Sequence, residues 1–384
     1  MAITIEEIAD QALKAARTVM EVRGRMLAPG GRKKPPVFNA AQLATLCGAD
    51  KNQVAYRMKQ GELPQGVVSD TGRRREFTLA EARQWVRAFR SKFARPANAS
   101  AVTIAVGNFK GGVSKTTTAM ALAQGLNLRG HRVLVIDMDP QGSLTTLFGI
   151  VPDTEVAEED TFVSLAVGDE SSIDYAIRST YWDGIDLVPA SQAIANCEFA
   201  LPARQMKDTK FEFWNVLNNG LAYARTKYDV IIIDTAPALN YCTINAFMAA
   251  DGLIVPTPPN ALDFASSAQF WTLFSDLALS LTQSASVEKS FEFIHVLLSL
   301  VDHQDTAATV VRQWISATYA EKVLPVEIPK TNVTKTSSAE FGTVYDVVRY
   351  EGSASTYRRA REAYDRVTEL VEQSIQAIWA KTGQ

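Results

Sequence analysis

Cysteine and histidine are scarce in this chain, with three of each in 384 residues. Cys47, Cys197 and Cys242 are far apart and odd in number, so they outline neither a disulfide framework nor a C-x-x-C metal site. We expect each to be a small core residue in a reducing compartment. The histidines are equally scattered, which argues against a zinc site or a histidine-based catalytic triad.

The sequence also lacks any run of 18 apolar residues, which excludes a typical membrane-spanning helix. Its first residues, MAITIEEIADQALKAAR, are acidic and amphipathic, unlike a secretory signal peptide. Hydrophobic residues make up 47% and charged residues 21% of the chain, as in ordinary globular proteins. We therefore expect a cytoplasmic protein of two or three domains.

Acidic residues are underrepresented in the first hundred positions. Residues 1–100 contain 18 Lys and Arg against 9 Asp and Glu, so they carry +9 of a total charge of −3 and the remainder carries −12. Such asymmetry favours a polyanionic partner, such as DNA, for the basic part. Surplus surface lysine and arginine is the alternative explanation.

Apolar residues recur in the first segment at alternating steps of three and four. This seam predicts an amphipathic helix over residues 1–28, which the Gly and Pro residues of APGGRKKPP bring to an end. So narrow a stripe favours pairing with a second copy, although packing on its own domain would also bury it. We predict a homodimer held by this helix. The seam residues are Ile5, Ile8, Ala12, Ala15, Val19, Val22 and Met26.

Residues 36–92 have the pattern of a winged helix-turn-helix DNA-binding domain. Asn39 with Gln42 and Asp50 with Gln53 resemble the capping boxes of two short helices, and Gly48 lies in the turn between them. Two strands around an Asp-Thr-Gly turn follow, and a third helix is expected to begin at Thr78 with Glu81 as its capping partner. A small helical packing domain is the alternative. The residues predicted to contact DNA are Lys51, Asn52, Gln53, Tyr56, Arg57, Arg73, Arg74 and Arg75.

The pattern changes after a polar stretch, SKFARPANASA, which has the composition of a linker. Short β-branched runs then alternate with helical stretches, and a long final helix is expected from Ser353 to Lys381. Strands that are apolar on both faces predict an α/β fold over residues 101–384, a parallel sheet flanked by helices. Ligands of such sheets bind at the carboxyl ends of the strands. The runs are VTIAVGNF, HRVLVID, IDLVPA, YDVIIIDT, DGLIVPT, FEFIHVLLSL and VLPVEIP.

A glycine-rich loop, GNFKGGVSKTTT, lies between the first of these strands and a helix. Backbone N–H groups at a helix N-terminus suit phosphate oxygens. The loop departs from the common G-x-x-x-x-G-K-[ST] pattern at Phe109 and Ser114 and carries a second lysine, Lys110. We expect Lys115 to reach the β- and γ-phosphates and Thr116 to bind Mg²⁺. The predicted nucleotide-binding residues are Lys110, Gly111, Gly112, Val113, Ser114, Lys115, Thr116 and Thr117.

Two acidic motifs follow neighbouring strands. VLVIDMDPQGS places Asp137 and Asp139 just after one strand, and YDVIIIDTAP ends another with Asp234. A carboxylate at the end of a strand can hold Mg²⁺ or its water ligands, although each aspartate alone could merely cap the next helix. Together with the loop, the carboxylates predict a site for a nucleotide and magnesium.

In this order, K-G-G-V-x-K-T-T, D-x-D-P-Q-G and I-I-I-D-T-x-P resemble the motifs of the deviant Walker-A ATPases, the ParA/MinD class, and most closely the ParA partition proteins. The N-terminal part is similar to that of the longer ParA proteins. The resemblance implies a deviant P-loop NTPase fold and a Mg²⁺-dependent ATPase, weak on its own, that uses ATP. It also implies a nucleoid-associated dimer that binds DNA nonspecifically, responds to a ParB-type centromere-binding protein and represses its own operon.

The resemblance further implies roles for single residues. Lys110 would contact the partner subunit's nucleotide, and Asp139 would orient the attacking water. Catalysis would rest on Lys110, Lys115 and Asp139, and the metal on Thr116, Asp139 and Asp234. A solvated face is the alternative for the basic residues implied in nonspecific DNA binding, which are Lys330, Lys335, Arg349, Arg358 and Arg359.

Two other functions compete with a partition ATPase. A MinD-like membrane ATPase would need a basic amphipathic C-terminus, and ELVEQSIQAIWAKTGQ is too acidic for one. A transcriptional repressor whose ATP domain only senses nucleotide, without a transport role, remains the alternative function.

Overall fold

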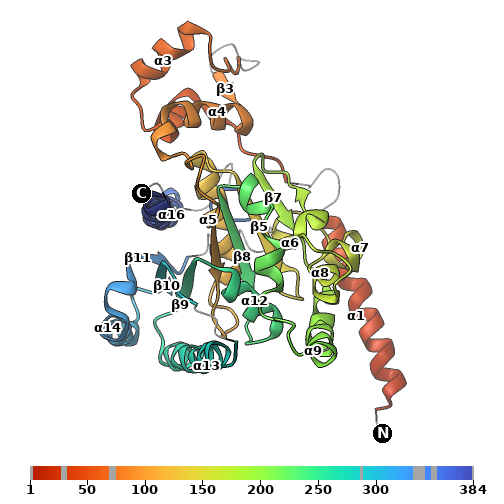
Figure 1. Cartoon of the computed structure of the whole chain (residues 1–384). Coiled ribbons are helices and arrows are strands. Elements are labelled where there is room, and N and C mark those ends of the chain that lie inside the picture. Colours follow the sequence, from red (N-terminus) through yellow and green to blue (C-terminus); the bar gives the residue numbers. More distant parts are fainter. Residues whose placement is uncertain are drawn as a thin grey trace.

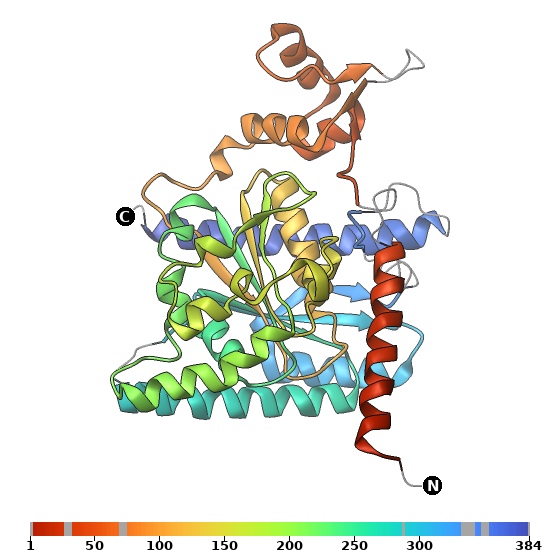
Figure 2. The same ribbon diagram turned by 90° about the vertical axis from the view of Figure 1, so that its right-hand side faces the viewer.

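An eight-stranded sheet with helices on both faces forms the centre of the computed structural model (Figures 1 and 2). The structure describes residues 3–26, 33–68, 75–285, 289–331, 342–346 and 353–382. Of the predicted DNA-binding residues, Arg73, Arg74, Lys335 and Arg349 lie outside these ranges. We call residues 36–92 the head and residues 101–384 the body.

The strand order in the sheet is β11-β10-β9-β4-β8-β5-β7-β6. Seven strands coincide with the predicted apolar runs, and neighbours among them are parallel. The sequence did not predict β6, a short edge strand antiparallel to β7. The strands are β4 (Val102–Val106), β5 (Val133–Met138), β6 (Arg178–Ser179), β7 (Ile185–Val188), β8 (Val230–Thr235), β9 (Gly252–Thr257), β10 (Phe293–Val301) and β11 (Val323–Pro329).

Alternate side chains of the central strands enter two separate cores, as the period of two in a strand requires, and a smaller third cluster forms around β10. Ile104 and Ile232 share one core with α5 and α16, whereas Ala105 and Ile231 share the other with α8, α9, α12 and α13. The helices of the body are α5 (Lys115–Leu128), α6 (Ser143–Leu147), α7 (Pro152–Glu155), α8 (Val163–Val167), α9 (Cys197–Lys207), α10 (Val216–Gly220), α11 (Ala224–Lys227), α12 (Tyr241–Ala249), α13 (Ala261–Ala285), α14 (Thr306–Tyr319) and α16 (Ala354–Thr382). Within the described ranges, no helix combines the length and apolar content needed to cross a membrane.

The head contains three helices and a small antiparallel sheet of order β1-β3-β2. All three predicted capping boxes are present: Asn39 with Gln42, Asp50 with Gln53, and Thr78 with Glu81. Gly48 ends the first helix with a left-handed φ of 62°, which glycine adopts without strain. The elements are β1 (Phe38–Asn39), α2 (Ala40–Cys47), α3 (Lys51–Gln60), β2 (Val67–Val68), β3 (Arg75–Phe77) and α4 (Leu79–Phe89).

The segment predicted as a linker is bound to the body along its length. Arg95 forms an ion pair with Asp229 at 3.2 Å. Gln376 donates to the Phe93 carbonyl at 2.7 Å, and the Trp379 indole donates to the Ser100 carbonyl at 3.0 Å. Its polar composition predicted a free connection, but α16, distant in sequence, supplies partners for its backbone.

A buried ionic cluster joins head and body where α4 ends. The Glu372 carboxylate of α16, 5% exposed, accepts from Arg90 at 2.8 Å, Arg129 at 2.9 Å and His131 at 2.8 Å. Burial raises the pKa of Glu372, but the hydrogen bonds of His131 and Arg90 outweigh it and lower this pKa to about 2. The carboxylate is therefore a charged link between α16, the end of α4 and the segment after α5.

Glu372→Gln should lower the free energy of unfolding at pH 7 by about 3 kcal/mol, the free energy that corresponds to lowering the pKa from about 4.3 to about 2. Because the pKa of Glu372 is lower in the folded protein than in the unfolded one, its carboxylate stabilises the fold at pH values above the unfolded pKa of about 4.3. This stabilisation is lost as the pH falls toward 2. Urea unfolding from pH 7 to pH 3.5 should show the gap between wild type and variant closing below about pH 4. An unchanged gap would contradict the linkage. Glu369→Gln, which removes an exposed partner of Arg366 on the same helix, is the control.

Helix α1 (Ile5–Met26) lies along one side of the body (Figure 2). The seam residues whose side chains the structure describes, Ile5, Ile8, Ala12 and Ala15, are all exposed, and Ile5 is 81% exposed. The side chains of Val19, Val22 and Met26 are outside the described set. Pairing of this helix with a second copy stays a prediction, and the exposed apolar seam is compatible with it.

Candidate functional site

The three sequence motifs end on adjacent strands. In the parallel register Val106 of β4 lies opposite Asp234 of β8, and Asp234 lies opposite Asp137 of β5. The glycine-rich loop follows β4 directly, so the loop and the aspartates meet at the carboxyl edge of the sheet. The structure therefore brings the loop and the two acidic motifs together.

The loop backbone is shaped for an anion. Gly112 and Ser114 both have left-handed φ values, 76° and 74°. Left-handed residues spaced in this way turn successive N–H groups toward a common concavity. Glycine adopts this conformation freely, whereas at Ser114 it costs about 1 kcal/mol. Ser114 is also the N-cap of α5, without a side-chain hydrogen bond, so it contributes its backbone alone.

Lys115 begins α5 and is 7% exposed. Its Nζ donates to the Lys110 carbonyl oxygen at 2.9 Å, across the loop. Burial lowers the pKa of Lys115, while the charges of Asp234 and Asp139 act to raise it. The ammonium thus bonds across the loop and lies within electrostatic reach of two carboxylates.

Asp234 is the least satisfied group of the site. It is fully buried, and neither carboxylate oxygen has a hydrogen-bond partner among the described residues. Burial, and then repulsion by Asp137, raise its pKa well above the usual value. The nearby Thr116 hydroxyl, and then the charge of Lys115, act to lower this pKa. An orphaned carboxylate close to a hydroxyl has the chemistry of a divalent-cation ligand.

Asp137 and Asp139 have different surroundings. Asp137 is fully buried and accepts from the Thr145 N–H at 2.9 Å and the Thr145 hydroxyl at 2.8 Å. Burial raises its pKa to about 7. Asp139 is 9% exposed, and its Oδ1 accepts from the Gln141 N–H at 2.9 Å. Asp137 therefore fixes the start of α6, while Asp139 has lone pairs left for a ligand.

The residues present fit Mg²⁺ held jointly with phosphate groups. No cluster of three or more His, Cys, Asp or Glu in the described part of the chain could hold a metal by itself. Magnesium in nucleotide sites typically takes one or two carboxylates and completes its shell with phosphates and water. Asp234, Thr116 and Asp139 supply such a partial set.

Sequence reasoning missed two residues whose side chains hold the loop in place. Asn108 is fully buried between the strand and the loop, and the Ser299 hydroxyl donates to the Val113 carbonyl at 3.0 Å. Asn108 lies inside the quoted motif, yet no spacing rule pointed to it. Ser299 lies on β10, 186 residues from its partner, so only the tertiary structure brings it there.

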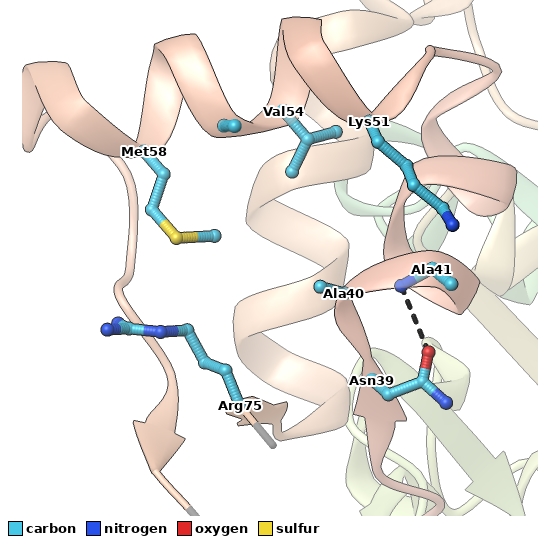
Figure 3. Close-up of a pocket in the computed structure, with 8 residues that line it drawn as sticks. Asn39, Ala40, Ala41, Lys51, Val54, Met58 and Arg75 are labelled. Carbon is cyan, nitrogen blue, oxygen red and sulfur yellow. Dashed lines mark hydrogen bonds between the residues drawn. The ribbon is translucent and has the colours of Figure 1, made fainter. Parts of the chain in front are cut away.

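The predicted contact residues of the head lie on the outer surface of α3, where Lys51, Asn52, Gln53, Tyr56 and Arg57 are exposed. Two are partly engaged, since the Gln53 side chain closes a capping box and Arg57 pairs with Glu62 at 3.4 Å. Arg75 donates to the Gln65 carbonyl. Lys51 and Arg75 lie on opposite sides of a pocket whose wall includes Val54 and Met58 (Figure 3).

The described basic candidates of the body lie at two places. Arg358 and Arg359 are exposed in the first turns of α16. Lys330 is exposed directly after β11, 3.9 Å from Asp302. Helix α16 packs on β11, the strand that Lys330 follows.

Comparison with known proteins agrees with this geometry. Residues 101–287 match the family model AAA_31, described as an AAA domain. The chain is 28% identical over 361 residues to Protein SopA of Escherichia coli (strain K12), across 91% of this chain and 92% of that protein. It is 29% identical over 268 residues to Chromosome partitioning protein ParA of Caulobacter vibrioides, across 68% of this chain and 94% of that protein.

Solved structures give the same fold. A cobyrinic acid a,c-diamide synthase from Mycobacterium smegmatis, with bound ATP analog and magnesium, superposes with a TM-score of 0.56 at 28% identity, over 71% of this chain and 94% of that one. A structure titled Partition Protein reaches a TM-score of 0.66 at 19% identity, over 97% of this chain and 98% of that one, which is a likeness of fold. The body thus has the fold of P-loop nucleotide-binding proteins.

Proposed function

We propose that this protein is a Mg²⁺-dependent ATPase of the ParA family that partitions DNA. The observation that carries the proposal is the convergence of the two-lysine loop with the orphaned carboxylate of Asp234 at one edge of the sheet. Similarity to SopA along nine-tenths of the chain, and to a chromosome partitioning protein, supports the function.

In the proposed site, the N–H groups of Gly111 to Thr117 bind the phosphates and the Lys115 ammonium turns from the Lys110 carbonyl to the β- and γ-phosphates. Thr116, Asp139 and Asp234 hold Mg²⁺, which neutralises phosphate charge when bound. Asp139 accepts a hydrogen bond from the attacking water and aligns it with the γ-phosphorus. Lys110 reaches the nucleotide of a second subunit and stabilises charge there in trans.

We assign three units to this activity. Residues 1–28 form a dimerisation helix through the exposed seam of α1. Residues 36–92 form a winged helix-turn-helix that reads an operator through α3, with Arg73, Arg74 and Arg75 on the wing. Residues 101–384 form the deviant Walker-A ATPase. Its ATP dimer binds DNA phosphates without sequence preference through Lys330, Lys335, Arg349, Arg358 and Arg359.

The proposed cycle links these units. ATP closes the dimer of the bodies on the nucleoid, and a ParB-type centromere-binding protein stimulates the slow hydrolysis. Hydrolysis then releases the protein from DNA. With ADP or without nucleotide, the dimer held by α1 represses its own operon by binding the operator through the heads.

The two DNA surfaces should be separable by mutation. Arg358→Ala with Arg359→Ala should weaken ATP-dependent binding to random duplex DNA, because two phosphate contacts are lost. The slope of log K against log salt should fall by about two for each subunit of the dimer that contacts the DNA. Lys51→Ala with Arg57→Ala should instead weaken binding to the DNA upstream of its own gene. Fluorescence anisotropy with both DNAs, in ATP and in ADP, measures each affinity.

Arg366→Ala, which removes an exposed arginine of α16 already paired with Glu369, is the matched control. If both double variants lose both activities while remaining folded, one surface serves both DNAs. If the wild-type protein binds the operator but does not bind random duplex DNA in ATP, the protein is a nucleotide-sensing repressor.

A further inference from the structure

Asn108 is a fully buried polar residue at the junction of β4 and the loop. Its Nδ2 donates to the Pro256 carbonyl of the neighbouring strand β9 at 2.9 Å. Its Oδ1 accepts from the Lys110 N–H, two residues on, at 3.1 Å. This is the geometry of an Asx turn, in which a side chain fixes the backbone that follows it. Asn108 therefore ties the first turn of the loop to the sheet.

The backbone of Lys110 is held on both sides, while its side chain is not. The N–H is bound by Asn108, and the carbonyl accepts from the Lys115 ammonium at 2.9 Å. Among the described residues, none forms a hydrogen bond or ion pair with the Lys110 ammonium. A fixed backbone with an unengaged ammonium is the arrangement of a group presented to something outside its own subunit.

Lys110 also lies at the boundary between an anchored and an open part of the loop. Before it, the Phe109 ring packs edge-on against Phe270 with centroids 4.7 Å apart. After it, Gly111 and Gly112 are exposed, and a side chain at either would meet no atom within 4 Å. The orientation of the Lys110 backbone is thus fixed by Asn108, which precedes it, and not by the two glycines that follow it.

We infer that Asn108 is a positioning residue for Lys110, holding its backbone so that the ammonium reaches the nucleotide of the partner subunit. The inference rests on the proposed function, in which Lys115 leaves the Lys110 carbonyl for the phosphates. Asn108 is then the remaining polar anchor of residue 110. Asn108 does not touch the nucleotide and acts only through Lys110.

A double-mutant cycle with Lys110 tests this role. Asn108→Ala should lower partner-stimulated ATP turnover about tenfold, as expected for a displaced catalytic group, with ATP affinity changed less than about threefold. Asn108→Ser should recover most of the turnover, because a serine hydroxyl can accept the N–H two residues on. Adding Asn108→Ala to Lys110→Ala should change turnover no further, since the coupled pair acts as one unit.

Ser299→Ala is the matched control, because it removes a buried hydrogen bond to the opposite side of the same loop. The fold reduction in turnover that Ser299→Ala causes should multiply with the reduction that Lys110→Ala causes. If the effect of Asn108→Ala also multiplies with it, Asn108 acts independently of Lys110 and the inference is overturned. If Lys110→Ala alone keeps wild-type turnover, the proposed trans role of Lys110 fails instead. Should Asn108→Ala not fold, Asn108→Leu, which is close in size but makes neither hydrogen bond, takes its place, and its loss of turnover must vanish in the Lys110→Ala background.

Discussion

Lys115→Ala is expected to abolish ATP turnover and to weaken ATP binding about 10- to 100-fold. Lys115 is the loop cation that lies inside the concavity of N–H groups, and a hydrogen bond to a charged group contributes about 1.5–3 kcal/mol. Its loss also leaves Asp234 and Asp139 without the neighbouring positive charge. Titration with a fluorescent ATP analogue and an assay of phosphate release measure the two effects.

Lys110→Ala is the control for this result, since it keeps Lys115, Thr116 and the backbone of the loop. That variant should still bind ATP, and its melting temperature should rise with ATP and Mg²⁺ as that of wild type does. Lys115→Ala should show almost no such rise. Normal hydrolysis by Lys115→Ala would refute the assignment of the whole site.

Asp139→Ala should lower turnover by about 10²–10⁴-fold, the contribution of a well-placed group that orients or deprotonates a nucleophile. Asp139 is the most exposed of the three aspartates of the site, and its backbone carbonyl accepts from the Gly142 N–H at 2.9 Å, a turn that the substitution leaves in place. The ATP dimer should therefore still form. The variant should remain on random duplex DNA in ATP, because the step that releases it is blocked.

Dissociation from surface-bound DNA after a wash with ATP buffer, with and without the centromere-binding partner, measures that release. Asp139→Asn is the conservative companion, which preserves the hydrogen bond from Gln141 but not the negative charge. Asp139→Ala leaving DNA as fast as wild type would mean that hydrolysis is not the release step.

Local rules anticipated much of this molecule. The capping boxes of α2, α3 and α4 depend on residues three apart, so they are legible in the sequence. The seven long strands are β-branched runs, and a parallel sheet must place the ends of β4, β5 and β8 side by side. Lys115, Thr116, Asp139 and Asp234 could be singled out as candidates because each lies at or after the carboxyl end of a strand in a recognisable motif.

The sequence by itself thus determined the elements, their order and the edge at which the site forms, because these follow from periodicity and from contacts between near neighbours. Tertiary structure alone decided how the site is held and how head and body are joined. Asn108 bonds to a carbonyl 148 residues away, Ser299 to one 186 residues away, and Glu372 collects Arg90 and Arg129 from 282 and 243 residues away. A buried polar group takes whichever partner the packed fold brings within hydrogen-bond distance, and no local pattern records that choice.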